Sequence, residues 1–374
     1  MFWSRRFSVR LSPMFADYAV SRLQGLTAGP NFPGSAASTV GTHDGNFHCD
    51  EALACGLLRH TSAFKDATIV RTRVPDVLNQ CQVVVDVGAV YDVAKQRFDH
   101  HQKEFQGTMD TGVKQYNTRL SSAGLVYKHF GKEIVRDFCE YCFKNGQLSS
   151  ALTEAQLMLV YDRVYKTFIE HIDGIDNGVE EFSPEVEGQS VKRNYQVTST
   201  LSSRVGRLYP RWNQDQTRDK EDAAFIKAVN LTTTEFFEAV EVQACSWLQA
   251  RSVVQKAFDA ATTVHPSGQI VVMSDGGCPW KDHLIDIEKE NKVFGRTLYV
   301  LYADAKQQWR IQCVPKENAS FANRKDLPWK GLRDDALSQA SGIDGCIFVH
   351  AGAFIGGNKT YDGAMQMALK ALEA

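Results

Sequence analysis

Histidines and carboxylates of the kind that bind metal ions gather at four places in the first half of the chain. In the first, His43, His48 and Asp50 lie within eight residues, just before an expected helix. Asp50 could instead cap that helix, and His43 could be a loop histidine bonded to the backbone. The segment is therefore a candidate metal site with a structural alternative.

The second candidate is Asp86, which follows the apolar run Val83-Val84-Val85. A carboxylate at the end of a buried strand loses hydration, so it needs a cation or hydrogen-bond donors to remain ionised. A metal ion would supply the cation. The alternative is a structural carboxylate that anchors the following loop.

The third candidate is the triplet Asp99-His100-His101. In an extended segment Asp99 and His101 point to one side and His100 to the other. We therefore expect one histidine on a metal, one on the substrate, and Asp99 fixing a histidine tautomer. Asp86, Asp99 and one of the two histidines are therefore the catalytic candidates.

The fourth candidate is the pair Asp173 and Asp176, which share a face at the end of an expected helix. A polar helix end stopped by Asn177-Gly178 is the alternative. Histidine and aspartate ligands favour Mn²⁺, Mg²⁺ or Co²⁺ over a thiolate zinc site. Two such ions about 3.5–4 Å apart share a carboxylate and support phosphoester hydrolysis, and Asp86 is best placed to bridge them.

The elements expected to position these groups alternate between strands and helices. The first unit is predicted to contain strands at 38–42, 68–72 and 81–87, helices at 49–60, 121–130, 134–144 and 153–172, and a loop at 178–188. A helical stretch at 220–260, broken near 232–234, leads to a second unit. That unit is predicted to have strands at 270–273, 297–303, 309–314 and 346–350 and helices at 279–289, 332–340 and 361–373. The apolar strands predict a parallel α/β sheet with its site at the carboxyl ends of the strands.

The composition narrows the class of protein. A chain of 374 residues with 43% hydrophobic and 23% charged residues suits two or three globular domains. No apolar run approaches the roughly 20 residues that span a bilayer, so membrane insertion is not expected. The net charge of −2 means that nucleic acid would have to bind through local basic patches.

Nine cysteines, an odd number, fit a reducing compartment better than a disulfide scaffold. The pair Cys139 and Cys142 could bind zinc or act in redox chemistry, and buried or surface thiols are the alternative.

The N-terminal segment differs in composition from the rest of the chain. Residues 1–31 hold Arg5, Arg6, Arg10 and Arg22 but a single acid, Asp17. This pattern is typical of a mitochondrial targeting sequence, followed by a linker at 28–38. A disordered basic arm is the alternative, and Met14 could start a shorter form with less basic charge.

One further segment of the first unit could hold a substrate. Arg204, Arg207 and Arg211 lie beside Tyr209 and Trp212, a combination that could bind a nucleic-acid strand by charge and stacking, or be a solvated helix face.

Several of these motifs together resemble a known superfamily. The order His43-x4-His48-x-Asp50, Val85-Asp86, Asp99-His100-His101 and Asp173/Asp176 is similar to the four motifs of the DHH phosphoesterase superfamily, which includes RecJ-like nucleases, oligoribonucleases and manganese pyrophosphatases. The segments at 41–54, 120–125, 201–208, 309–315 and 331–334 more narrowly resemble the melanocyte proliferating gene (MYG) exonuclease family.

The resemblance implies a two-domain DHH phosphoesterase-like α/β fold. After a targeting segment and linker at 1–38, it implies a parallel-sheet metal domain at 39–219 and a helical connector at 220–260. A smaller α/β C-terminal domain at 261–374 would bind substrate across a cleft.

The resemblance also assigns ligands. His43, His48 and Asp86 would hold one metal, and Asp50, Asp86, His100 and either Asp173 or Asp176 the other, with His101 facing the scissile phosphate. His48 stands where the wider superfamily usually has aspartate, with one extra residue in the spacing, which leaves the metal identity open.

In the C-terminal domain, the segment 348–357 resembles the glycine-rich binding loop of the family and includes His350, Gly356 and Gly357. Asn358 occupies a position where this loop often has histidine. Independently, paired glycines before a helix let backbone N–H groups approach a phosphate or carboxylate, with a plain tight turn as the alternative.

The activity implied by the resemblance is 3′–5′ exonucleolytic cleavage of RNA in mitochondria and, in relatives, in the nucleus or nucleolus. Two divalent ions, Mn²⁺ before Mg²⁺ or Co²⁺, would be the cofactors, and single-stranded RNA or short oligonucleotides the partners. A homo-oligomer is left open. The alternatives are a phosphohydrolase of small phosphorylated molecules or dinucleotides, and a regulatory protein that retains the fold.

Overall fold

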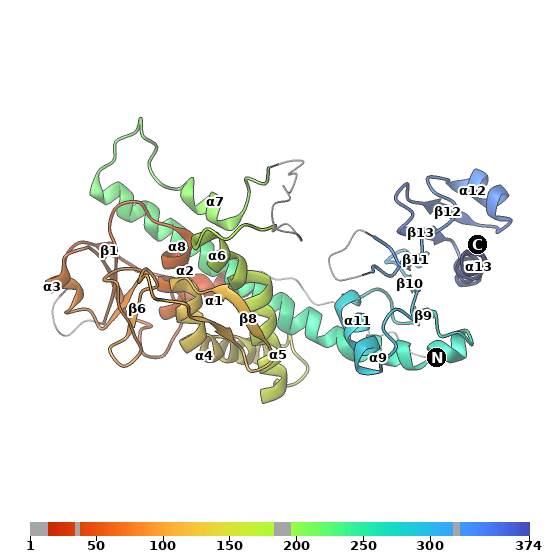
Figure 1. The fold of residues 1–374 in the computed structure, drawn as a ribbon, viewed down its shortest axis with the longest axis horizontal. Coiled ribbons are helices and arrows are strands. Elements are labelled where there is room, and N and C mark those ends of the chain that lie inside the picture. The colour runs from red at the N-terminus through yellow and green to blue at the C-terminus, as the bar shows by residue number, and fades with distance from the viewer. Residues whose placement is uncertain (1–13, 34–37, 183–195, 317–321) are drawn as a thin grey trace. The chain divides into compact units, whose positions relative to one another are not determined.

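The computed structural model describes residues 14–33, 38–182, 196–316 and 322–374, drawn in colour in Figure 1. The chain divides into two compact units, residues 1–245 and 246–374. Both units mix helices with a sheet, which confirms the α/β fold class. Among the described helices, none combines the length and the apolar character needed to cross a bilayer.

The first unit is built on a six-stranded sheet in the order β1-β3-β2-β4-β6-β5. Its strands are β1 Ala28–Gly29, β2 Thr39–Thr42, β3 Thr68–Arg71, β4 Val83–Val85, β5 Tyr91–Asp92 and β6 Arg97–Phe98. Every neighbouring pair is parallel except β5 with β6, so the predicted parallel sheet is confirmed. Strands β2 and β4 are buried along their whole length, and the motifs with His43 and Asp86 follow their carboxyl ends.

The helices of this unit include α2, whose ten residues are all buried. They are α2 Cys49–Leu58, α3 Pro75–Leu78, α4 Ser122–Lys144, α5 Glu154–Val164, the π-helical turn η1 Tyr165–Ile169, α6 Glu170–Asp176, α7 Leu201–Gly206 and α8 Arg218–Glu241. A short hairpin pairs β7 Thr108–Asp110 with β8 Gln115–Arg119. Helices α4 and α8 both lie against α2, and Figure 1 shows α8 running the length of this unit.

The contact between α2 and α8 explains one wrong prediction. We expected a helix break near 232–234, because threonine is a weak helix former. Helix α8 is continuous there: Thr232 bonds the carbonyl oxygens of Ala228 and Val229, and Thr233 packs onto Gly56. A Cβ at Gly56 would lie 1.8 Å from Thr233 Oγ1, so the glycine permits the close approach of the helices. Likewise, the helices predicted at 121–130 and 134–144 form one helix, α4.

The described N-terminal residues 14–33, which fall within the segment predicted to be a targeting sequence and linker, form a helix and a strand of the first unit. Helix α1 Met14–Ser21 buries Tyr18, Ala19 and Leu23, the last just past its end. The Tyr18 ring contacts His60 and three aromatic rings, those of Phe138, Tyr141 and Phe237. Strand β1 then extends the parallel sheet beside β3. The arginine-rich residues 1–13 lie outside the described part of the chain.

The second unit contains a five-stranded sheet in the order β12-β13-β11-β10-β9. Its elements are α9 Leu248–Asp259, α10 Ala261–Val264, β9 Ile270–Met273, α11 Lys281–Glu290, β10 Tyr299–Ala303, β11 Trp309–Cys313, α12 Asp334–Ser341, β12 Cys346–Val349, β13 Ile355–Asn358 and α13 Tyr361–Glu373. One apolar core includes residues of α12 and α13, and another includes residues of α9 and α11. The π-helical turn η2 Val242–Trp247 contains the boundary between the units, inside the helical stretch predicted as a connector. Strand β13 is an element that the sequence analysis missed.

Candidate metal centre

The centre of the site is Asp86, directly after β4. Its carboxylate lies between two imidazoles, with Oδ2 3.3 Å from His43 Nε2 and Oδ1 3.3 Å from His100 Nε2. The backbone of Asp86 has φ +59°, a left-handed conformation that is costly for most residues and that clusters at functional sites. The chain thus turns sharply at the strand end and aims this carboxylate at both histidines.

The loop after β2 contributes His43, and the start of α2 contributes His48 and Glu51. His48 is the N-cap of α2, and its backbone N–H donates to both Glu51 carboxylate oxygens, at 2.7 and 2.9 Å. Glu51 Oε1 also lies 3.1 Å from His43 Nε2. The group His43, His48, Glu51 and Asp86 has ligand atoms within 4.8 Å of one another. The sequence analysis missed Glu51 as a ligand candidate. Its spacing three residues after the N-cap is that of a capping box and could have placed it at the start of α2.

A second group of ligand atoms joins His48, Asp50 and Asp176. Asp50 is buried: its Oδ2 accepts the Ser122 N–H at 3.3 Å, while Oδ1 has no hydrogen-bond partner. Burial raises the pKa of Asp50 well above its usual value, and the charges of Asp86 and Asp176 raise it further. A divalent cation fits this arrangement, because it would neutralise crowded carboxylates and supply a partner for the orphaned oxygen.

The third group brings Asp86, His100 and His101 together. His100 is buried, with Nε2 3.1 Å from Asp176 Oδ2, whereas 60% of the His101 side chain is exposed. Asp99 accepts hydrogen bonds from the His101 backbone at 3.1 Å and its Nδ1 at 2.7 Å. The two histidines therefore differ in exposure and in their second carboxylate partner. Asp99 orients the exposed His101.

The two candidate aspartates of α6 have different surroundings. Asp173 is buried, and its oxygens accept hydrogen bonds from Ser121, Gly124 and Tyr165. These donors tie α6 to the start of α4, so the carboxylate acts as a structural anchor. Asp176 instead faces His100 and belongs to a group of ligand atoms. The geometry thus favours Asp176 over Asp173 as the ligand.

Residues at the start of α4 and the end of β8 support the ligands. Ser122 donates through Oγ to Asp86 Oδ1 at 3.1 Å. Arg119 donates to the carbonyl oxygen of His100. Ser122 lies in a segment on which the family resemblance rests, but neither residue was identified as functional from its type or spacing.

The pKa values of the buried histidines and of Asp86 are set by burial and by the charged groups crowded around them. Burial disfavours the charged form of His43, but Asp86 and Glu51 outweigh this and raise its pKa to about 10. Asp176 and Asp86 similarly overcome burial at His100 and raise its pKa to about 10. Burial opposes ionisation of Asp86, yet these two histidines lower its pKa. The raised pKa values of the two histidines reflect the crowding of carboxylates around them, which a bound cation would neutralise.

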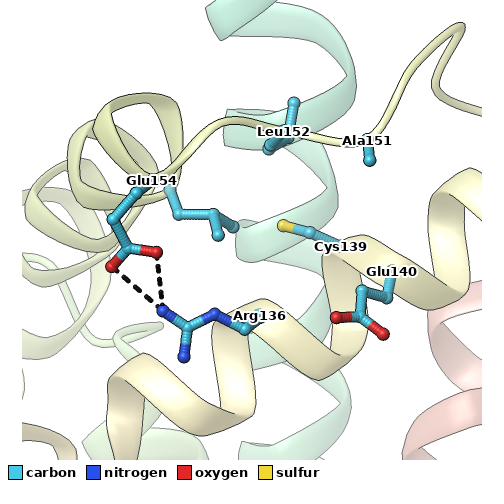
Figure 2. Close-up of a pocket in the computed structure, with 7 residues that line it drawn as sticks. Arg136, Cys139, Glu140, Ala151, Leu152 and Glu154 are labelled. Atoms are coloured by element: carbon cyan, nitrogen blue, oxygen red, sulfur yellow. Dashed lines mark hydrogen bonds and ion pairs between the residues drawn. The ribbon is translucent and has the colours of Figure 1, made fainter.

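A separate surface pocket lies between α4 and the start of α5. Figure 2 shows Arg136 and Glu154 facing each other there, joined by contacts of 3.0 and 2.7 Å. Cys139 lines this pocket and is buried, as is Cys142, which agrees with the interpretation of the pair as buried thiols. None of the predicted metal ligands is among the lining residues.

Comparisons with known proteins place the chain in a family. A family model described as "Uncharacterised protein family (UPF0160)", that of the MYG1 exonucleases, matches residues 39–372. The chain belongs to the MYG1 family. It is 45% identical over 337 residues to the MYG1 exonuclease of Homo sapiens, covering 89% of this chain and 85% of that protein. The MYG1 exonuclease of Bos taurus is also 45% identical, over 89% of this chain and 84% of that protein. The MYG1 protein of Schizosaccharomyces pombe is 42% identical, over 89% of this chain and 97% of that protein. No solved structure gives a significant match.

In this MYG1 family member, the predicted substrate-binding arginines differ in availability. Arg204 on α7 pairs through two nitrogens with the carboxylate of Glu235 on α8, so its charge is already neutralised. Arg207 is exposed and donates to the Thr198 carbonyl oxygen at 2.8 Å. The basic patch is therefore smaller than its sequence suggests.

The glycine-rich segment 348–357 of the second unit covers the end of β12, the connection that follows and most of β13. Gly356 and Gly357 of β13 are buried and pair with β11 on one side and β12 on the other. Asn358 is buried too, and its side chain bonds the Asp344 carbonyl oxygen and the Thr360 N–H. The neighbouring His350 remains exposed, outside the strand. The backbone groups of these two glycines that pair in the sheet are not available to a phosphate, whereas the connection with His350 lies outside the strands.

Proposed function

We propose that this protein is a metal-dependent phosphodiester hydrolase that uses two divalent ions, with Mn²⁺ preferred over Mg²⁺ and Co²⁺. The observation that carries the proposal is the overlap of three groups of ligand atoms, two of which share Asp86 and two of which share His48. His43, His48, Glu51 and Asp86 would hold one ion, and Asp50, Asp86, His100 and Asp176 the other. A strand-end aspartate shared by both ligand sets is what the resemblance to DHH phosphoesterases leads us to expect.

The residues around the ligands have distinct tasks. When bound, two divalent ions would lower the pKa of a water molecule and stabilise charge on a phosphoryl group. Ser122 and Arg119 hold Asp86 and the His100 backbone in position. His101 is exposed and its Nδ1 donates to Asp99, so Nε2 of the protonated imidazole can donate a hydrogen bond to a phosphate oxygen. The chain thus presents a directed donor beside its ligands.

The substrate that we propose is RNA, cleaved from its 3′ end. Support comes from the relatives named exonucleases, at 45% identity over most of both chains. The second unit, in the same proposal, is the substrate-binding domain of a two-domain DHH enzyme. Its exposed His350 is the remaining candidate there for contact with the strand.

The test uses single-stranded RNA of roughly 12 nucleotides, labelled at either end, with Mn²⁺, Mg²⁺ or Co²⁺. A 3′–5′ exonuclease shortens the 5′-labelled strand stepwise and releases mononucleotides at once from the 3′ label. Pyrophosphate and dinucleotides are assayed in parallel. Faster turnover of these small substrates, with long strands untouched, would indicate the small-molecule phosphohydrolase instead. Metal binding without turnover of any substrate would indicate the regulatory protein.

We further propose a mitochondrial location, with a nuclear fraction open. Because α1 and β1 pack into the first unit, we place the targeting information in the residues before Met14. Residues 1–13 fused to a reporter protein should direct it to mitochondria, and the same fusion with Arg5, Arg6 and Arg10 changed to glutamine is the control. If the reporter stays in the cytosol with the unchanged residues 1–13 as well as with the glutamine control, the proposed mitochondrial location is wrong.

A further inference from the structure

One aromatic side chain in the first unit is far more exposed than its type predicts. Trp212, in the connection between α7 and α8, is 90% exposed, more than any other large hydrophobic side chain in the described residues. Figure 1 shows this connection extending outward from the helices of the unit. A buried aromatic side chain covers 150–250 Å² of surface, so a bare indole leaves a large favourable contact unused.

The exposure of Trp212 is built into an ordered turn. The Arg211 N–H donates to Gln214 Oε1 at 2.9 Å, and the Gln214 N–H donates to the Arg211 carbonyl oxygen at 2.8 Å. The Gln216 side chain donates to the Pro210 carbonyl oxygen at 3.2 Å. The turn is therefore closed by its own hydrogen bonds and presents the indole to solvent.

The same connection is fastened at both ends to the loop that carries metal ligands. At one end, the Tyr209 ring packs edge-on against Phe47, with centroids 5.5 Å apart, and Phe47 precedes His48. At the other end, Arg218 donates to the carboxylate of Asp44, next to His43, at 3.2 Å. The turn with Trp212 thus has a fixed place beside the metal centre of the same unit.

Charge around the turn favours an anionic partner. Arg204 and Arg218 are engaged by Glu235 and Asp222. Arg207 and Arg211 are exposed, and Arg211 is the immediate neighbour of Trp212. An indole face next to exposed guanidinium groups matches single-stranded nucleic acid, whose bases stack and whose phosphates bind cations.

We propose that Trp212, with Arg207 and Arg211, forms a platform that holds single-stranded RNA outside the metal centre. The inference rests on the proposed hydrolase function and adds a second contact to it. A base stacks on the indole, and the two arginines pair with phosphates of the same strand. A dinucleotide that occupies the metal centre is too short to use the platform, whereas a longer strand spans both.

The experiment compares the full-length protein with Trp212→Ala, Trp212→Phe and the control Phe143→Ala. Phe143, 40% exposed at the end of α4, is an aromatic residue of the same unit without a role in the site. Binding of a single-stranded RNA of roughly 12 nucleotides is measured in EDTA, and its cleavage with Mn²⁺. Trp212→Ala should weaken binding and raise KM by roughly tenfold, as expected for one lost stacking contact. Trp212→Phe should retain most of the affinity. If the strand quenches the fluorescence of Trp212 in the wild type, that quenching should be lost in this variant.

The readouts separate this inference from the proposed function. Hydrolysis of bis(4-nitrophenyl) phosphate should be the same in all four proteins. Unchanged strand binding in Trp212→Ala, or a wild-type protein that binds no strand, would overturn the platform even if the small ester is cleaved. Failure to cleave any ester would overturn the hydrolase, while strand binding in EDTA would still test Trp212. Loss of a wild-type oligomer in Trp212→Ala, with strand binding intact, would assign the indole to self-association instead.

Discussion

The segment around Asp86 in the first unit and β13 in the second both contain motifs expected from the family resemblance, yet they differ in which backbone groups remain unpaired. Asp86 follows the last residue of its strand and turns its carboxylate toward His43 and His100. Gly356 and Gly357 lie within a strand and are paired on both sides. Residues at a strand end can be spared for chemistry, whereas residues inside a central strand are committed to the sheet. The position of a motif relative to the strand end thus determines which of its backbone groups are paired in the sheet.

The largest expected effect comes from Asp86→Asn, which removes the shared charge at the strand end. Asparagine tolerates the left-handed backbone of this position, so the fold should persist. We expect metal binding to weaken and phosphodiester hydrolysis to fall by more than about 100-fold, beyond the usual loss for an outer-shell partner. Metal content by elemental analysis and turnover with Mn²⁺ measure both quantities.

The matched control for this variant is Asp92→Asn in β5, whose carboxylate pairs with Lys95 on the surface. It should leave metal content and turnover unchanged. If Asp86→Asn retains the metal stoichiometry and turnover of the wild type, the bridging role of Asp86 is wrong.

A smaller effect is expected from Asp99→Asn, which keeps the shape but removes the charge beside His101. Asp99 raises the pKa of His101, mainly through their hydrogen bond. If the protonated imidazole donates to the phosphate, activity is present below the raised pKa and declines as pH rises through it. The variant should lower activity roughly 10- to 100-fold and move this decline to lower pH. A pH–rate profile with the same alkaline limb in both proteins would contradict the assignment.

Much of the first unit could be predicted from sequence because its signals are local. The apolar run before Asp86 gives the parallel strand, and the spacing from His43 to Asp50 gives the turn into α2. What could not be predicted depends on partners far away in the chain. Asp173 and Asp176 look equivalent in sequence, and the contact of Asp173 with the start of α4 distinguishes them.

The N-terminal segment and β13 show the same limit. Nothing in the residues near Tyr18 signals that four rings from distant positions enclose it. The glycines of β13 lack the side chains by which a strand is recognised, and their pairing with β11 is a long-range property. Arg204 looked available to bind a nucleic-acid strand because its partner Glu235 is 31 residues away in the sequence.

The smallest expected effect on chemistry comes from Gly357→Val in β13. A Cβ at this position would lie 2.6 Å from Arg310 Nη1 and 3.3 Å from the Trp309 carbonyl oxygen, so β11 and the arginine must move. Overpacking of this kind costs about 1–3 kcal/mol in the free energy of unfolding. The metal ligands belong to the other unit, so metal content and hydrolysis of bis(4-nitrophenyl) phosphate should stay near wild type. Chemical denaturation and elemental analysis measure the two outcomes.

Gly357→Ala and Arg310→Ala sharpen this prediction. Alanine adds the colliding Cβ without the two methyl groups of valine, so its destabilisation should be smaller. Combining Gly357→Val with Arg310→Ala removes one of the colliding partners, and the double variant should recover part of the stability lost by valine alone, because contacting residues are not additive. Oligonucleotide cleavage should follow stability in this series. If Gly357→Val is as stable as the wild type but loses oligonucleotide cleavage alone, the glycines contact the substrate directly, and the contrast drawn between β13 and the strand end at Asp86 fails.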